Sequence, residues 1–545
     1  MNSVAIDYIP PIRDEDGRTI GIDVAVRTLL DAYLRYSQTD SFYCRTSERE
    51  DYDRFRERML EMGTDPDRCQ FLPAGDSAGL AQISTLFRPD PNINRALATR
   101  AEPNAYGICG LSHTMSSMQV MGTPATAITE PLQPWDAIVC PSNAIRSVVE
   151  ALWESAGQGA PPPPAQLPVI PLGIDTEHFA SLVDTEKRAA QRNILGVSED
   201  DAVVLAYGRL SYHNKSHPLP LLLAAEALTK KRKGNGNIHL VFFGYFTGDS
   251  FREDYAKAAD SICETAHVTF IENQDARFPD ALWAGADIFV SLVDNIQESF
   301  GLTPIEAMAC GLPVLVTDWD GYRDTVRDGV DGFLVPTLAP PSGSGQELVR
   351  RYLAGEDVYG EYLAGTSQSV AVDVEATAAH LERLVETPAL RREMGTAAQA
   401  RVRAIYDWKS IIPAYEDLWR ELNVVREREA RVGPRVKHAI TGPTELDPYA
   451  VFRSFPTHAL RELDRIEVSD QAARLLAQRL QHRMNMFAPV HLIEPAELPR
   501  LLTILNRNQT VGDALADWPD AKRSHVLRTL VWLVKMGVAR YLPAL

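Results

Sequence analysis

Residues 297–314, QESFGLTPIEAMACGLPV, give the clearest indication of the fold. The apolar run ADIFVSLV before it predicts a buried strand, and PIEAMAC within it predicts a helix. Gly311 is placed to end that helix in the left-handed conformation. Strand, turn and helix in this order are typical of α/β proteins with parallel sheets. The stretch also places two glutamates, Glu298 and Glu306, around the predicted turn.

The spacing leaves two explanations open for Glu306. Thr303 could cap a helix whose first residue is Pro304, and Glu306 would then close a capping box. In that case its carboxylate only satisfies backbone donors. Alternatively, Glu306 faces a ligand together with Glu298.

A purely structural role is harder to assign to Glu298, because it follows a strand at the edge where open α/β sheets bind ligands. The helix start behind it suits an anion. The backbone amides that point there belong to Phe300, Gly301 and Leu302. Two carboxylates beside an anion site suit a ligand that carries both phosphates and hydroxyl groups.

The same alternation of short apolar runs and helical patterns extends along most of the chain. It predicts two βαβ domains, with a proline-rich spacer before the second. The tail is rich in helical patterns, and its order of helix, turn, long helix and short strand is typical of a winged-helix-like module. The predicted parts are an N-terminal Rossmann-like domain at 1–190 with a crossing-back helix at about 396–425, a second Rossmann-like domain at 191–395, a linker at 426–445 and a helical domain at 446–545.

Composition narrows the class of protein. The 545 residues carry a formal charge of −18, which disfavours nucleic acid or an anionic membrane as the main partner. The six cysteines lack the spacing of a zinc site. The first residues show no signal peptide, and no apolar run is long enough to span a membrane. We therefore expect a cytoplasmic protein, with peripheral attachment to the inner membrane face left open.

Several segments in chain order resemble the family-4 retaining glycosyltransferases, which have the GT-B fold. The strongest is ESFGLTPIEAMACGLPVLVT, which resembles the family's pair of glutamates separated by seven residues. The others are GLSHTM (110–115), VIPLGIDTEHF (169–179), AYGRLSYHNK (206–215) and DGVDGFLVP (328–336). The resemblance covers residues 1–425. It implies a GT-B fold, two Rossmann-like domains facing a cleft, to which this chain adds a helix-rich C-terminal domain.

The resemblance also implies roles for individual residues. Glu306 would bind the ribose hydroxyls of a nucleotide sugar, and Glu298 the hydroxyls of its sugar. Arg209 and Lys215 would neutralise the diphosphate as it leaves. His113 would contact or position the donor sugar, which completes the expected catalytic set with Glu298, Arg209 and Lys215.

The remaining donor contacts would be made by backbone groups. Gly21, in the first β–α turn, would let the backbone approach the phosphates. The amides of the turn after Glu298 would do the same, from Phe300, Gly301, Leu302 and Thr303. No metal and no cofactor is expected, because the arginine and the lysine take that role. The triplet DWD at 318–320 is interpreted as a turn rather than as a metal site.

This chain departs from the family pattern around the sugar and the phosphates. It has Ile20-Gly21 where the family has two glycines, and Lys215 lies one residue later than usual. Asp320 and Arg323 stand in the family's glycine-rich segment. The base, the sugar, the acceptor and the linkage therefore stay open.

The function predicted is transfer of a sugar from a nucleotide-diphosphate sugar to a hydroxyl acceptor, with retention, by a front-face mechanism. A hexosyltransferase is expected, and the acceptor is a glycan such as a surface polysaccharide, a glycolipid or a small metabolite. The alternative is a catalytically silent GT-B scaffold that acts through its C-terminal module. Residues 446–545 are expected to contact a protein or the acceptor rather than nucleic acid.

Overall fold

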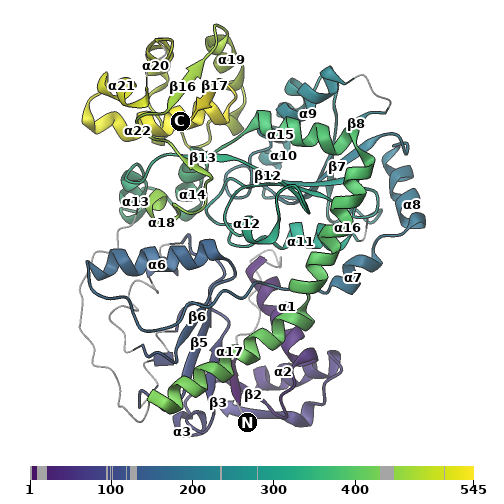
Figure 1. Cartoon of the computed structure of the whole chain (residues 1–545), viewed down its shortest axis with the longest axis vertical. Helices are drawn as coiled ribbons and strands as arrows, with labels where there is room; N and C mark the ends of the chain where they lie inside the picture. The colour runs from purple at the N-terminus through teal and green to yellow at the C-terminus, as the bar shows by residue number, and fades with distance from the viewer. Residues whose placement is uncertain are drawn as a thin grey trace. The chain divides into compact units, whose positions relative to one another are not determined.

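The structure is a computed structural model that describes residues 3–8, 21–93, 96–97, 100, 102–117, 120–122, 132–232, 236–278, 280–429, 447–507 and 510–544. The chain divides into two compact units. The first comprises Met1–Asp175 with Arg403–Thr444, and the second comprises Thr176–Val402 with Glu445–Leu545. Each unit therefore combines two separate stretches of the chain (Figure 1). The domain boundaries inferred from the sequence stay predictions, and most of the predicted linker lies outside the described residues.

The first unit contains a six-stranded sheet in the order β3-β2-β1-β4-β5-β6, with every neighbouring pair parallel. Its strands are β1 (Val4–Asp7), β2 (Phe42–Thr46), β3 (Cys69–Pro73), β4 (Thr85–Arg88), β5 (Gly107–Leu111) and β6 (Ala137–Val139). Its helices are α1 (Gly21–Tyr36), α2 (Arg49–Glu61), α3 (Ser77–Leu80), α6 (Asn143–Gly157) and α17 (Trp408–Glu429), with a 3-10 turn at Pro66–Arg68. Strands β1, β4, β5 and β6 are buried at every residue, as in parallel sheets that are covered on both faces.

Helix α17 contributes a large part of the first unit's core. Its apolar side chains lie in one cluster with those of α1 and the sheet. The rings of Phe87 and Tyr415 are 5.7 Å apart, and those of Tyr33 and Trp419 are also 5.7 Å apart. A segment distant in sequence thus completes the packing around this sheet.

The second unit repeats the same topology, with its parallel strands in the order β12-β11-β10-β7-β8-β9. These are β7 (Ala202–Leu210), β8 (Ile238–Phe246), β9 (His267–Glu272), β10 (Ile288–Ser291), β11 (Val314–Thr317) and β12 (Gly332–Val335). Numbered along the chain, both sheets have the order 3-2-1-4-5-6 of a doubly wound fold. The prediction of two Rossmann-like sheets with a helix-rich C-terminal region is confirmed.

Helices precede, connect and follow the strands of the second sheet along the chain. They are α7 (Thr176–Ser181), α8 (Thr185–Leu195), α9 (Leu219–Lys231), α10 (Asp249–Ile262), α11 (Leu302–Ala309), α12 (Tyr322–Thr325), α13 (Gln346–Leu353), α14 (Tyr359–Ser367), α15 (Val374–Glu386) and α16 (Pro388–Ile405). The short strands β13 (Thr337–Ala339) and β14 (Ala371–Val372) pair antiparallel. Across the described helices of both units, none is long and apolar enough to cross a membrane.

We call residues 447–544 the C-terminal segment. It contains α18 (Pro448–Val451), β15 (His458–Ala459), β16 (Arg465–Val468), α19 (Ala472–Arg479), α20 (Leu498–Leu505), α21 (Val511–Ala516), α22 (Asp520–Lys535), β17 (Ala539–Leu542) and three 3-10 turns. Strand β15 pairs parallel with β13, so the segment extends a small sheet of the second unit. Its apolar side chains share one hydrophobic cluster with the second sheet. The resemblance to a winged-helix module stays a prediction.

Candidate active site

The second sheet reverses its strand order between β7 and β10, which are neighbours in the sheet but not in the chain. The chain leaves β7 towards α9 and β8, and it leaves β10 towards α11 and β11. Doubly wound sheets bind ligands outside the carboxyl ends of the strands at such a switch point. The candidate site is therefore formed by the residues that follow these two strands, which we call the β7 loop (211–217) and the β10 loop (292–301).

An ion pair joins the two loops. The ammonium of Lys215 donates to Oε2 of Glu298, and both side chains are largely buried, at 22% and 14% exposed. Burial alone would raise the pKa of Glu298. The ammonium of Lys215 first, then the backbone N–H of Ser299 and the charge of Arg209, together outweigh burial and hold that pKa below its usual value. Glu298 is therefore ionised at neutral pH.

Arg209 lies at the end of β7 beside this pair. Its Nη2 donates to Oε1 of Gln297 at 2.7 Å and to the carbonyl oxygen of Asn214 at 3.2 Å. Its Nε is buried, and no residue that the structure describes accepts from it. A cavity of about 40 Å³ adjoins both Arg209 and Lys215. Two cations next to one ionised carboxylate leave a net positive site, which favours a bound anion.

Glu306 lies half-buried on α11 with its carboxyl group uncommitted. Burial raises its pKa to about 7, and only the charge of Lys215 opposes the shift, with no hydrogen bond from any described residue. The helix begins at Leu302 after Gly301, and no side chain caps it. The hydroxyl of Thr303 is buried and finds no partner in the described part of the chain. The capping-box explanation is therefore wrong, and the ligand-facing one remains.

The turn before α11 packs tightly against a buried tyrosine. Gly301 has φ +80°, and a Cβ atom there would lie 2.1 Å from Cε1 of Tyr322. The hydroxyl of Tyr322 is 2.8 Å from that of Ser291 at the end of β10. Glycine at 301 thus lets the backbone of Phe300 and Leu302 lie close to the strand ends. Gly311 has φ +78° after the last turn of α11, as predicted.

The triplet DWD forms the turn that the sequence predicts. Asp318 accepts from Nε of Arg323 at 2.7 Å and from the hydroxyl of Thr457 at 2.6 Å. Asp320 is 1% exposed, has φ +36°, and its Oδ2 has no partner among the described residues. Burial, and next the charge of Glu298, raise its pKa well above the usual range. Within the described ranges, no group of three or more histidine, cysteine or acidic side chains could hold a metal ion.

Asp320 is a residue whose environment the sequence analysis missed. Its position in a glycine-rich turn was visible, and a left-handed conformation is one that aspartate tolerates better than most residues. Its burial beside Glu298 depends on the packing of several loops, which leaves no local signal.

The structure places two other predicted residues in the first unit. His113 follows β5, is buried, and its Nε2 lies 2.7 Å from the carbonyl oxygen of Pro89. Gly21 is the first residue of α1, and the turn before it lies outside the described residues. The structure thus brings together Arg209, Lys215 and Glu298 in the second unit, with Glu306 nearby. The roles predicted for these residues are not tested by their positions.

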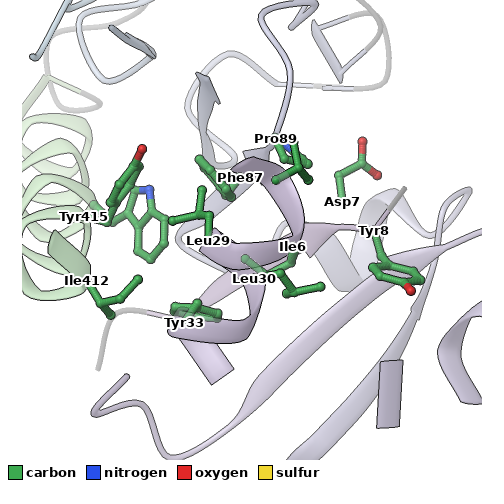
Figure 2. Close-up of a pocket in the computed structure, with 12 residues that line it drawn as sticks. Ile6, Asp7, Tyr8, Leu29, Leu30, Tyr33, Phe87, Pro89, Ile412 and Tyr415 are labelled. Atoms are coloured by element: carbon green, nitrogen blue, oxygen red, sulfur yellow. The ribbon is translucent and has the colours of Figure 1, made fainter. Parts of the chain in front are cut away.

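The first unit also contains an apolar pocket at the carboxyl ends of β1 and β4 (Figure 2). It is lined by Ile6, Asp7, Tyr8, Val26, Leu29, Leu30, Tyr33, Phe87, Pro89, Ile412, Tyr415 and Trp419. Asp7 is held there by the guanidinium groups of Arg45 and Arg88. The space of about 30 Å³ has the size of one or two water molecules and is too small for a sugar.

Comparison with known sequences points to one class of protein. Residues 187–342 match the sequence model described as "Glycosyl transferases group 1". This range contains the strands of the switch point and both loops. The curated D-inositol 3-phosphate glycosyltransferases of Mycobacterium bovis (strain BCG / Pasteur 1173P2) and Mycobacterium tuberculosis (strain ATCC 25618 / H37Rv) are each 28% identical over 271 residues. The match covers 49% of this chain and 46% of theirs, so the chain spans about half the length of these relatives.

Comparison with solved structures concerns the fold alone. A glycosyltransferase from Rickettsia africae ESF-5 is similar with a TM-score of 0.51 at 13% identity, and the match covers 77% of this chain and 98% of that one. The two doubly wound units, together with this structural similarity, establish the predicted GT-B fold class.

Proposed function

We propose that this protein is a retaining glycosyltransferase that moves a sugar, a hexose in the first instance, from a nucleotide-diphosphate sugar to a hydroxyl acceptor. The observation that carries the proposal is the convergence of Arg209, Lys215 and Glu298 at the switch point, inside the segment that matches group 1 glycosyl transferases. A half-buried carboxyl group without a partner, on Glu306, adds an acceptor for hydroxyl groups at the same edge of the sheet.

The charges of the site suit departure of a nucleoside diphosphate. Arg209 and Lys215 neutralise the negative charge that grows on the leaving phosphate, and cations placed there stabilise the transition state most. Lys215 already neutralises the charge of Glu298. The N–H donors of its ammonium would therefore be shared between the diphosphate and the sugar hydroxyls. Because the cations take this role, we propose a reaction that needs no metal. Retention by a front-face mechanism requires no protein nucleophile.

The acceptor and the setting are also proposals. A glycan, a glycolipid or a small metabolite all offer the hydroxyl group required. The name of the mycobacterial relatives makes a phosphorylated polyol the acceptor to test first. We propose a cytoplasmic enzyme, with acceptor or protein contacts through the C-terminal segment. The roles of His113 and Gly21 remain predictions from the family resemblance. A catalytically silent scaffold is not favoured, because it has no need of a charged diphosphate site.

A nucleotide screen tests the proposal directly. A ligand that binds only the folded state at about 100 times its Kd stabilises it by about 2.7 kcal/mol. We expect one of UDP, GDP, ADP and dTDP to raise the melting temperature of the wild type. Glu306→Ala is expected to remove that rise while the unliganded melting temperature changes little, since the carboxyl group has no protein partner in the described part of the chain.

The outcomes separate the candidate functions. No shift with any nucleotide would refute the proposed donor site. A shift without sugar transfer from the matching nucleotide sugars, across glycan, lipid and polyol acceptors, would favour the silent scaffold.

Nucleotide affinity should also depend on pH through Glu306. Its pKa of about 7 means that the carboxyl group is ionised above that pH and protonated below it. The ionised form accepts from both ribose hydroxyls, so binding weakens as the pH falls. We expect the Kd of the nucleotide found in the screen to rise about tenfold from pH 8 to pH 6. Isothermal titration with Glu306→Gln gives the control, because its amide does not titrate. Parallel curves for wild type and variant would exclude Glu306 as a ribose ligand.

A further inference from the structure

The C-terminal segment reaches into the β10 loop through one buried lysine. Lys535, the last residue of α22, is 0% exposed, and its ammonium contacts the carboxylate of Asp294. It also donates to the carbonyl oxygen of Ser367 at 2.7 Å. Asp294 is 1% exposed and lies in the β10 loop, four residues before Glu298. Glu298, the residue proposed to bind the sugar hydroxyls, is thus connected to α22 through its own loop.

The pair is held firmly because neither charge is stable there alone. Burial lowers the pKa of Lys535 and raises the pKa of Asp294, and each partner counteracts the shift of the other. Removing one member of a buried pair leaves the other charge unbalanced in an apolar setting, which is strongly unfavourable. Movement of the β10 loop away from α22 would carry the same penalty.

A second contact ties the β7 loop to the same segment. His217 lies two residues after Lys215 and is buried. Its Nδ1 accepts from the backbone N–H of Leu219 at 3.2 Å, so its Nε2 carries the proton and donates to the carbonyl oxygen of Met484 at 2.8 Å. Burial, with the charge of Lys535, lowers its pKa to about 3 and keeps the ring neutral. Trp532 of α22 in turn donates to the carbonyl oxygen of Asn485 at 2.7 Å.

We propose that the C-terminal segment is part of the donor site, and that Lys535 is a positioning residue that fixes the β10 loop and thereby Glu298. This inference rests on the proposed function for what the loop binds, but the positioning itself does not. Lys535 contacts no substrate. It acts through Asp294, while the contact between His217 and Met484 holds the loop of Lys215 in place. Lys215 and Glu298 are then both anchored, each through its own loop, to the C-terminal segment, which lies outside the family core.

The same helix offers a matched control. Arg528 lies seven residues before Lys535 on α22 and is also 0% exposed. It donates to the carboxylate of Glu347 at 2.9 Å and to the carbonyl oxygen of His491 at 2.8 Å. Its loss removes a buried cation of the same segment. Its partners, however, lie outside both loops of the candidate site.

The experiment compares Lys535→Met with Arg528→Met in the full chain, well below either melting temperature. Both substitutions should lower the melting temperature. Only Lys535→Met should speed hydrogen exchange of a peptide covering residues 292–301, on the order of tenfold. Only that variant should also raise the Kd of the bound nucleotide and the KM of the donor, by about ten- to a hundredfold. Should Lys535→Met not fold, Asp294→Asn replaces it with the same readouts.

The double variant Lys535→Met with Asp294→Leu exchanges the ion pair for an apolar contact, which buried sites tolerate. Slow loop exchange and tight binding should return in it. Equal effects of the two single substitutions on loop exchange, or none from either, would overturn the positioning role. A wild type that binds no nucleotide would instead refute the proposed function, and the exchange comparison would still decide whether Lys535 orders the loop.

Discussion

We expect Lys215→Met to lower kcat for the proposed sugar transfer by about 10²–10³-fold, because in that reaction it would remove a cation from the leaving diphosphate. It also leaves the carboxylate of Glu298 without its counter-charge, so that the site repels the phosphates. The measurement is the initial rate with saturating donor and acceptor. Lys257→Met is the control, since its side chain is 66% exposed and its partner Glu253 is 68% exposed, and its rate should equal that of the wild type.

A second variant separates chemistry from folding. Lys215→Met combined with Glu298→Gln removes both charges, so the melting temperature should recover relative to the single variant while kcat stays low. A kcat for Lys215→Met within about threefold of the wild type would contradict a role in catalysis, since loss of such a contact costs far more.

Gly301→Ala destabilises the second unit by about 3 kcal/mol. A left-handed backbone costs a residue with a Cβ atom about 1–2 kcal/mol. The remainder comes from overpacking, because the new atom would lie 2.1 Å from Cε1 of Tyr322, which is fully buried. Unfolding in urea, followed by tryptophan fluorescence, measures the loss.

Gly329→Ala is the matched control for this substitution. Gly329 has φ +73°, but a Cβ atom there would meet nothing within 4 Å. It should therefore show the backbone cost alone, about 1–2 kcal/mol. Equal losses at the two positions would mean that the turn moves away from Tyr322 without cost.

The sequence predicted those parts of the site that depend on local order. Arg209 lies at the end of one strand, Lys215 follows it, and Glu298 follows another, so the doubly wound order alone brings them to one edge. The predicted start of the helix was wrong because of a tertiary contact. Thr303 satisfies the local rule for a cap, but Gly301 takes a left-handed conformation against Tyr322, and the helix begins earlier.

Burial and distant pairing could not be predicted in the same way. The raised pKa of Glu306 results from the packing around α11, which no motif encodes. Lys535 and Asp294 are 241 positions apart, so no periodicity links them. The helical patterns of the tail indicated a separate module, whereas the apolar residues that the C-terminal segment shares with the second sheet follow the same local pattern as those of any helix.

The position of α17 in the sequence affects when the first unit can fold during translation. The first sheet is translated early, but the helix whose Tyr415 and Trp419 rings cover Phe87 comes after the second sheet. At the rate of ribosomes, residues 176–402 take roughly 10–50 s to be made. During that time Phe87 and its neighbours are not yet packed against α17, so the nascent chain exposes apolar surface. The first unit therefore completes its hydrophobic core only after α17 has been synthesised.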